Sequence, residues 1–169
     1  MGCFEQRSAA DEQRGRGEVT MSTQQQATAE RRTGTQGMIN NLMEERRQML
    51  VLFCQVAGLE PYARTESLEQ LLQNFCQVLV DYTAFGHFEV FGKISDGTER
   101  RSQVLHVAEE IYPGFVEATE TAVAFNDKYD ISDHALSFDH LSEDMSLLGE
   151  EIAIRIELED RLIATMLAR

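Results

Sequence analysis

The chain of 169 residues is 43% apolar, which is enough to bury the core of one folded domain. Its formal net charge of −14 disfavours direct binding to the phosphate backbone of a nucleic acid. The sequence contains no run of eighteen apolar residues, so we expect no membrane-spanning helix and a soluble protein of the cytoplasm.

The first 37 residues differ in composition from the rest of the chain. Residues 1–37 have almost no large apolar side chains and hold five basic and five acidic residues, so we expect a disordered extension. Met21 and Met38 are alternative start positions within or next to it. Residues 38–169 hold ten basic and twenty-four acidic residues, and we expect them to form the folded domain. The charge excess on this domain favours basic partners.

Two amphipathic helices are predicted at the start of the folded part. Apolar residues recur at steps of three, four or seven over residues 38–57, and Gly58 is a natural helix end. A second helix begins near Thr65 or Ser67, and Ser67 with Gln70 has the spacing of a capping box. The core face of this helix consists of Leu68, Leu71, Leu72, Phe75, Leu79 and Tyr82.

Shorter helices are predicted in the middle of the chain. We expect Gly86 to interrupt the second helix and a short helix to follow from His87 to Ile94, with Phe88, Phe91 and Ile94 on one face. A turn at residues 95–98 then leads to a helix over residues 102–111.

Pro113 is expected to open a further helix, because proline is favoured in the first helical turn. A short helix is expected around residues 135–140. The last helix is long, from about Leu141 to Leu167, and its apolar face is wide enough for a central position. Two pairs on it have i,i+4 spacing, Arg155–Glu159 and Glu157–Arg161, and each is expected to contribute only about 0.2–0.5 kcal/mol.

These elements predict an all-α protein. No repeated alternation of apolar and polar residues bounded by tight turns indicates a strand. Long amphipathic helices joined by short connections are typical of an up-and-down antiparallel helix bundle, here with additional short helices.

The sequence predicts no disulfide framework, metal centre or cofactor site. The sequence has an odd number of widely spaced cysteines, which are Cys3, Cys54 and Cys76. We expect Cys54 and Cys76 to be small core residues. The phosphate-binding, dinucleotide-binding and hydrolase motifs are all missing from the sequence, and so is the Glu-x-x-His motif of di-iron carboxylate bundles.

The histidines do not alter this conclusion. His106 precedes Glu109 in the reverse order to the di-iron motif, and the Asp-His pairs at residues 133–134 and 139–140 lie in a polar segment that is typical of a solvated loop. His87 is more typical of a helix cap or a packed side chain than of a catalytic base. We therefore expect no enzyme, and keep a metal- or ligand-binding helical bundle enzyme as the alternative.

The second helix also carries a polar stripe. Gln70, Asn74, Gln77 and Asp81 are spaced by four, three and four residues, which usually indicates a solvated helix face. Asp81 is followed by Phe85 and Phe88 at spacings of four and seven. A charge beside aromatic rings is typical of binding hot spots. We predict that Asn74, Gln77, Asp81, Phe85 and Phe88 bind a partner protein, and a homodimer through Phe85 and Phe88 stays open.

Three segments resemble the regulator of sigma D (Rsd) and AlgQ family. The first is Phe-Cys-Gln-Val-Leu-Val-Asp-Tyr at residues 75–82, followed by Gly-His-Phe at residues 86–88. The second, Ile-Tyr-Pro at residues 111–113, is similar to an Ile-Trp-Pro element of the family. The third, Leu-Glu-Asp-Arg-Leu-Ile at residues 158–163, resembles its Leu-Glu-Asp-Lys-Leu-Ile. The resemblance covers about residues 38–167, although the tryptophan of the Rsd branch's first helix is replaced in the Leu42–Met43 region.

The resemblance implies a helical bundle that sequesters the primary (housekeeping) sigma factor of RNA polymerase. The family binds chiefly the C-terminal sigma region, a basic helix-turn-helix domain that reads the −35 promoter element, and so favours alternative sigma factors. Asp81 corresponds to an aspartate at the family's sigma interface, and Phe88 to the aromatic of its Gly-His-Phe element. Pseudomonad-type members are associated with alginate and siderophore gene control. Some relatives bind a sugar-phosphotransfer carrier or an alarmone hydrolase, which the sequence does not assign to this chain.

Overall fold

The computed structural model describes the backbone of residues 9–62, 64, 66–130 and 137–168, with side chains from Gln25 onward. Every regular element in this part is helical, so the predicted all-α class is confirmed. In chain order the elements are α1 (Ala9–Ala57), α2 (Leu68–Phe85), the π-helical segment η1 (Gly86–Phe91), α3 (Gly92–Ser95), α4 (Ser102–Tyr129) and α5 (Leu141–Leu167).

The chain divides into two units between Gly37 and Met38, and the disorder expected for residues 1–37 stays a prediction. Ala9–Gly37 has helical backbone as part of α1, and its described side chains, from Gln25 on, are almost all exposed. The stretch contains no proline, and its alanine, glutamate, glutamine and arginine residues favour a helix, against the opposing preference of its four glycines. A helix that buries no face depends on these intrinsic preferences alone.

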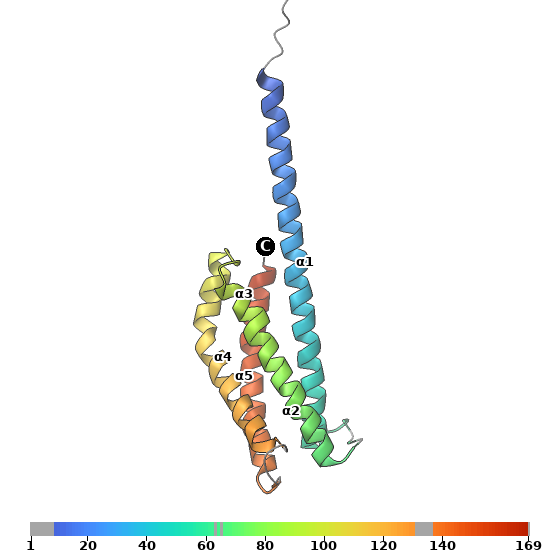
Figure 1. Cartoon of the computed structure of the whole chain (residues 1–169). Coiled ribbons are helices and arrows are strands. Elements are labelled where there is room, and N and C mark those ends of the chain that lie inside the picture. The colour runs from blue at the N-terminus through green and yellow to red at the C-terminus, as the bar shows by residue number, and fades with distance from the viewer. Residues whose placement is uncertain (1–8, 63, 65, 131–136, 169) are drawn as a thin grey trace, which may run out of the picture. The chain divides into compact units, whose positions relative to one another are not determined.

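The second unit, residues 38–169, is the predicted up-and-down bundle. Figure 1 shows that the remainder of α1, then α2, α4 and α5, run in alternating directions, with α5 between α4 and α1. The apolar faces of the four helices meet in one continuous core. The largest fully buried apolar and aromatic side chains are Leu42, Met49, Leu71, Leu72, Phe75, Leu79, Tyr82, Phe115, Tyr129, Leu148 and Leu162.

The start of α2 was predicted correctly. Ser67 is the N-cap residue, and its hydroxyl accepts a hydrogen bond from the Gln70 backbone N–H at 3.2 Å. Gly58 ends α1 with a φ of +70°, a left-handed conformation that side chains disfavour. Of the six residues expected on the core face of α2, Leu68 is half-buried and the other five are buried.

The interruption predicted at Gly86 is only a change of helix type, because α2 ends at Phe85 and the π-helical η1 begins at Gly86. Gly86 has helical dihedral angles, φ −60° and ψ −40°, and the chain stays helical through η1 and α3 to Ser95. The reading of Phe88, Phe91 and Ile94 as one face was wrong, because Phe88 is 69% exposed while the other two are buried. A π-helical turn holds more residues than an α-helical turn, so positions three apart in η1 no longer align.

Pro113 does not open a new helix, contrary to the prediction. It lies inside α4, which runs unbroken from Ser102 to Tyr129. Proline removes one hydrogen bond and crowds the carbonyl four residues earlier, which costs about 3 kcal/mol in an isolated helix. Burial of Ile111 and Phe115 on either side holds α4 together at this point. The short helix expected at residues 135–140 falls partly outside the described residues, and residues 137–140 are not helical.

None of the described helices is both long enough and apolar enough to cross a membrane.

Two glycines one and a half turns apart give a matched test of the packing around η1. A Cβ at Gly86 would lie 2.5 Å from Nη2 of Arg155 and 3.2 Å from the Phe115 ring, whereas one at Gly92 would meet only the His87 carbonyl, at 3.9 Å. We expect Gly86→Ala to lower the free energy of unfolding by about 1–3 kcal/mol, because the side chains it meets are buried. Denaturant unfolding of the purified variant measures this.

Gly92→Ala is the control. Its helical φ and open surroundings predict unchanged or higher stability, by up to about 1 kcal/mol, since alanine restricts the unfolded chain. Equal losses in both variants would contradict the close approach at Gly86.

Candidate functional site

The polar stripe predicted on the second helix exists as an ordered row on α2. The Gln70 side-chain amide donates to Asn74 at 3.2 Å, and Asn74 in turn donates to Glu66 at 3.2 Å. One turn further along, the Gln77 amide donates to both carboxylate oxygens of Asp81 at 3.3 Å. These residues are exposed apart from the half-buried Asn74, so the row is a set of pre-oriented polar groups at the surface.

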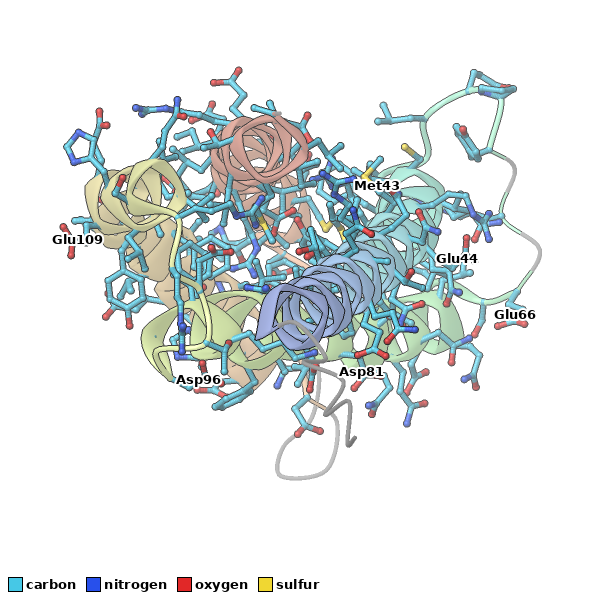
Figure 2. All side chains as sticks on the ribbon, turned by 90° about the horizontal axis from the view of Figure 1, so that it is seen from above. Met43, Glu44, Glu66, Asp81, Asp96 and Glu109 are labelled. Atoms are coloured by element: carbon cyan, nitrogen blue, oxygen red, sulfur yellow. The ribbon has the colours of Figure 1, made fainter. Side chains whose placement is uncertain are left out.

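The aromatic residues predicted to join this row occupy different environments. Asp81 is exposed and hydrogen-bonded to Gln77, whereas Phe85 is half-buried and packs against the core. Phe88 lies beyond them in η1 and is 69% exposed, with its ring edge-on to His87 at 5.1 Å between centroids. The structure therefore brings Asn74, Gln77 and Asp81 onto one face, but it places Phe88 with other aromatic groups. Figure 2 shows Asp81 on the outside of the bundle.

Directly beneath this surface lies a buried polar network, in a place where the sequence predicted a weak ion pair. Arg155 and Glu159 were expected to be an i,i+4 pair of small energetic effect, and their side chains are only 1% and 2% exposed. Arg155 Nε donates to Glu159 Oε1 at 2.9 Å. The guanidinium also lies over the Phe115 ring, 3.9 Å from its centroid. The few tenths of a kcal/mol expected for this pair is the figure for solvated ion pairs on a helix surface. It does not apply to a pair as buried as Arg155 and Glu159.

Glu159 is shared by residues of three helices. Its Oε2 atom accepts from the Tyr82 hydroxyl of α2 at 2.7 Å and from Arg46 Nη2 of α1 at 3.0 Å. Arg46 Nη1 also donates a hydrogen bond to Asp160 Oδ1 at 2.6 Å. A single buried carboxylate thus accepts hydrogen bonds from two guanidinium groups and a phenol, which joins α1, α2 and α5.

Arg155 extends the network to the fourth helix. Its Nη1 donates to the Thr119 hydroxyl of α4 at 2.6 Å, and its Nη2 donates to the Thr83 carbonyl of α2 at 3.2 Å. Tyr82 and Thr83 follow Asp81 directly in the chain, so the turn of α2 that presents Asp81 is held from behind by hydrogen bonds.

The titration behaviour of this network follows from its burial. Burial raises the pKa of the Tyr82 phenol far above its ordinary value, and the Glu159 charge next to it raises it further. Burial alone would lower the pKa of Arg46, but its hydrogen bond to Asp160 and the nearby Glu159 charge outweigh it, so the pKa is raised. The hydroxyl of Tyr82 therefore stays protonated and acts as a donor to Glu159.

Sequence reasoning missed Arg46 and misjudged Arg155 and Glu159, although a signal was present. Arg46 occupies a position of the apolar stripe of α1, between Leu42 and Met49 at spacings of four and three. Arg155 and Glu159 interrupt the core stripe of α5 in the same way. Charged residues in core register are typical of a buried ion pair, because only a partner of opposite charge offsets their desolvation.

The other candidate residues form no comparable centre. Among the described residues, no three His, Cys, Asp or Glu side chains are placed to hold a metal ion. His140 lies near the start of α5, with its Nδ1 atom 3.1 Å from Glu143. Cys76 is buried, which raises the pKa of its thiol to about 12, and Cys54 is half-buried. His134 lies outside the described residues.

The buried carboxylate can be tested against an exposed neighbour on α5. We expect Glu159→Gln to lower the free energy of unfolding by about 3–5 kcal/mol, because the buried Arg155 guanidinium loses its counter-charge and Arg46 keeps only Asp160. Glu157→Gln, at an exposed position two residues away, is expected to change it by less than about 0.5 kcal/mol. Thermal unfolding followed by circular dichroism compares the two, and equal effects would refute the assigned role of Glu159.

Comparison with known proteins places the chain in a family. The model of the family described as regulator of RNA polymerase sigma(70) subunit, Rsd/AlgQ, matches residues 21–167. The chain belongs to this family. A regulator of sigma D from Yersinia enterocolitica is 32% identical over 136 residues, which are 77% of this chain and 80% of that protein. One from Salmonella paratyphi B is 32% identical over 154 residues, which are 85% of this chain and 90% of that protein. No solved structure shows a significant match.

Membership of the Rsd/AlgQ family confirms the resemblance that the three sequence segments carried. Two of these segments supply parts of the buried network, since Tyr82 lies in the first and Glu159 with Asp160 in the third. The matched region begins before Met38 and includes part of the first unit.

Proposed function

We propose that this Rsd/AlgQ-family protein binds the primary sigma factor of RNA polymerase, mainly through its C-terminal domain that reads the −35 element. Sequestration of that domain leaves core polymerase available to alternative sigma factors. The observation that carries the proposal is the α2 row, in which Gln77 orients the exposed Asp81 carboxylate and the buried network holds the same turn from behind. The family description, regulator of RNA polymerase sigma(70) subunit, supports the choice of partner.

Charge complementarity supports a DNA-reading domain as the partner. Residues 38–169 carry the whole net charge of −14, and a helix-turn-helix domain presents basic groups to the phosphate backbone. Attraction between the two surfaces speeds encounter, and the acidic surface then competes with DNA for the same basic groups.

Within this proposal, Asp81 makes the central contact and Gln77 fixes its direction, while Asn74 extends the polar row. A carboxylate that is already hydrogen-bonded loses little conformational freedom on binding, so more of its interaction with an arginine or lysine is retained. Phe85 and Phe88 are the proposed apolar flank of this contact. Phe85 offers only part of its ring, since it also packs against the core.

The alternatives have separate tests. A metal- or ligand-binding bundle enzyme would bind stoichiometric metal, which elemental analysis of the purified protein detects. A homodimer through Phe85 and Phe88 would double the mass measured by light scattering.

A change of charge at Asp81 tests the site directly. We expect Asp81→Asn to weaken binding of the isolated C-terminal sigma domain by about 1–3 kcal/mol, because the variant keeps the shape and a hydrogen-bonding group but loses the charge. Isothermal titration calorimetry measures the affinity, and circular dichroism should show unchanged helicity. Full affinity in this variant would remove Asp81 from the interface.

Glu69→Gln is the matched control for charge. Glu69 is an exposed carboxylate of the same helix, twelve positions before Asp81 and so about a third of a turn away around the axis. We expect its loss to reduce affinity by less than about 0.5 kcal/mol. Equal losses in Asp81→Asn and Glu69→Gln would indicate general attraction to an acidic surface in place of a defined contact.

Ionic strength tests the role of charge in the encounter. We expect the association rate with the sigma domain to fall as salt rises from about 0.05 to 0.5 M, while the dissociation rate changes much less, because screening acts mainly on long-range attraction. Stopped-flow fluorescence gives both rates. An association rate that does not respond to salt would contradict electrostatic steering.

A further inference from the structure

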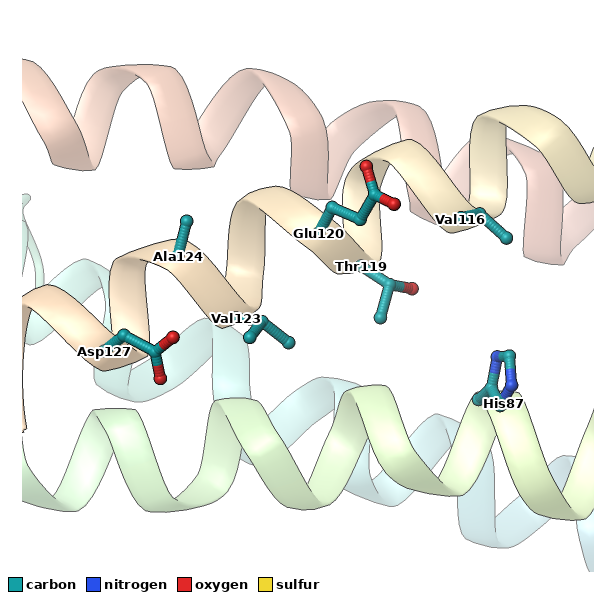
Figure 3. A pocket seen from close by; sticks show the side chains of 7 residues that line it. All are labelled: His87, Val116, Thr119, Glu120, Val123, Ala124 and Asp127. Atoms are coloured by element: carbon teal, nitrogen blue, oxygen red, sulfur yellow. The ribbon is translucent and has the colours of Figure 1, made fainter.

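A groove on another part of the bundle is not used by the proposed sigma-binding row. It measures about 290 Å³ and lies along α4, with His87 of η1 at one end. Its wall is made by Val116, Thr119 and Val123, spaced three and four residues apart on one face of α4. Figure 3 shows Thr119 and Val123 pointing toward the helix that carries His87, and the His87 ring pointing back toward α4.

The groove is mostly apolar and is continued by exposed apolar side chains. Val123 is 46% exposed, and beyond His87 lie Phe88 and Tyr112, which are 69% and 42% exposed. The His87 ring contacts both aromatic rings, edge-on to Phe88 at 5.1 Å and tilted against Tyr112 at 6.3 Å between centroids. An exposed apolar strip of this kind on an acidic protein is typical of a surface that a partner covers.

The π-helical segment creates this arrangement. An α-helical continuation of α2 would carry Phe88 three residues before the buried Phe91 on the same face, whereas η1 turns Phe88 outward. Residues of a π-turn depart from regular helix geometry at some cost, and such turns are frequent at functional sites. His87 is half-buried at the end of the groove, and its Nδ1 atom has no hydrogen-bond partner among the described residues.

Charge and size limit what the groove accepts. Glu120 and Asp127 lie beside the apolar wall, about two helical turns apart on α4, and they favour basic groups next to an apolar anchor. Small-molecule sites usually measure about 300–1,000 Å³, so this groove is at the lower limit and suits one or two side chains of a partner. A second copy of the chain fits poorly, because a two-fold contact would bring these carboxylates near their own copies.

We propose that the groove between η1 and α4 is a second docking surface, which receives the apolar face of a basic amphipathic helix of a partner protein. An aliphatic side chain of that helix enters between His87 and Val123, and its lysines or arginines face Glu120 and Asp127. None of the groove-lining residues belongs to the α2 row, and the groove borders the proposed sigma site only at Phe88, next to His87. Figure 2 shows Asp81 and Glu109 on different sides of the bundle, and Glu109 lies seven residues before Val116, on the groove side of α4.

A synthetic helical peptide with leucines along one face and lysines on both flanks serves as the probe. Fluorescence polarisation with the full-length protein measures its affinity. We expect Val123→Asn to raise the Kd at least about tenfold, since a polar side chain replaces the centre of the apolar wall. Leu147→Asn changes an equally apolar, 57% exposed side chain on α5 and is expected to leave the Kd within about twofold. Equal effects of the two variants would overturn the proposal.

Charge is tested with a second pair of measurements. The combined variant Glu120→Gln and Asp127→Asn should raise the Kd of the peptide and reduce the salt dependence of that Kd. Glu69→Gln should do neither. The same peptide with glutamates in place of lysines should not bind. Equal binding of both peptides would show that the surface is apolar without selecting for charge, and it would overturn the choice of a basic partner.

Two further outcomes separate this proposal from its alternatives. Asp81→Asn should weaken binding of the sigma domain and leave binding of the peptide unchanged. If only Val123→Asn weakened binding of the sigma domain, the groove would be the sigma site and no second surface would exist. Light scattering distinguishes a second copy, since a dimer of the wild-type chain that Val123→Asn dissociates would overturn a separate partner. Weaker binding of the sigma domain by Asp81→Asn, together with an unchanged affinity for the peptide, supports both proposals independently.

Discussion

The Glu159 carboxylate is the group on which the arrangement of the bundle depends. It accepts hydrogen bonds from Arg155, Arg46 and Tyr82, and is itself 2% exposed. A buried ion pair is weak evidence for stability, because desolvation offsets most of its Coulombic energy. It specifies geometry nonetheless, since only one arrangement of the helices supplies every donor. In this protein the four long helices are placed by apolar burial and held in register by one shared acid.

The network also connects the two surfaces that we propose to bind partners. On one side Tyr82 and Thr83, which hydrogen-bond to the network, follow Asp81 in the chain. On the other side Thr119, which accepts from Arg155, forms part of the wall of the α4 groove. Two surfaces on different helices are therefore supported by the same rigid centre. Binding surfaces carried on helices that are fixed in this way keep their geometry better than surfaces on loops.

Much of the fold could be predicted because its signals are local. Helical spacing located α2 and α5, the Ser67 cap marked where α2 begins, and Gly58 marked where α1 ends. The helical path continues through both Gly86 and Pro113 for a common reason. Both residues break isolated helices, but packing overrode their intrinsic preferences, with Arg155 and Phe115 against Gly86 and buried neighbours on either side of Pro113. The polar row ending at Asp81 was likewise foreseen from spacing, although its role in binding remains a prediction.

The amino-acid sequence by itself determined the helical class, the acidic character of the folded part, the polar row on α2 and the family, because each depends on residue type and spacing along one chain. Only the tertiary structure decided that Arg46, Arg155 and Glu159 meet in the core, and that Phe88 turns outward beside a groove on α4. Which side chains meet across helices depends on how the helices rotate and pack against one another. No local pattern in the chain records that rotation.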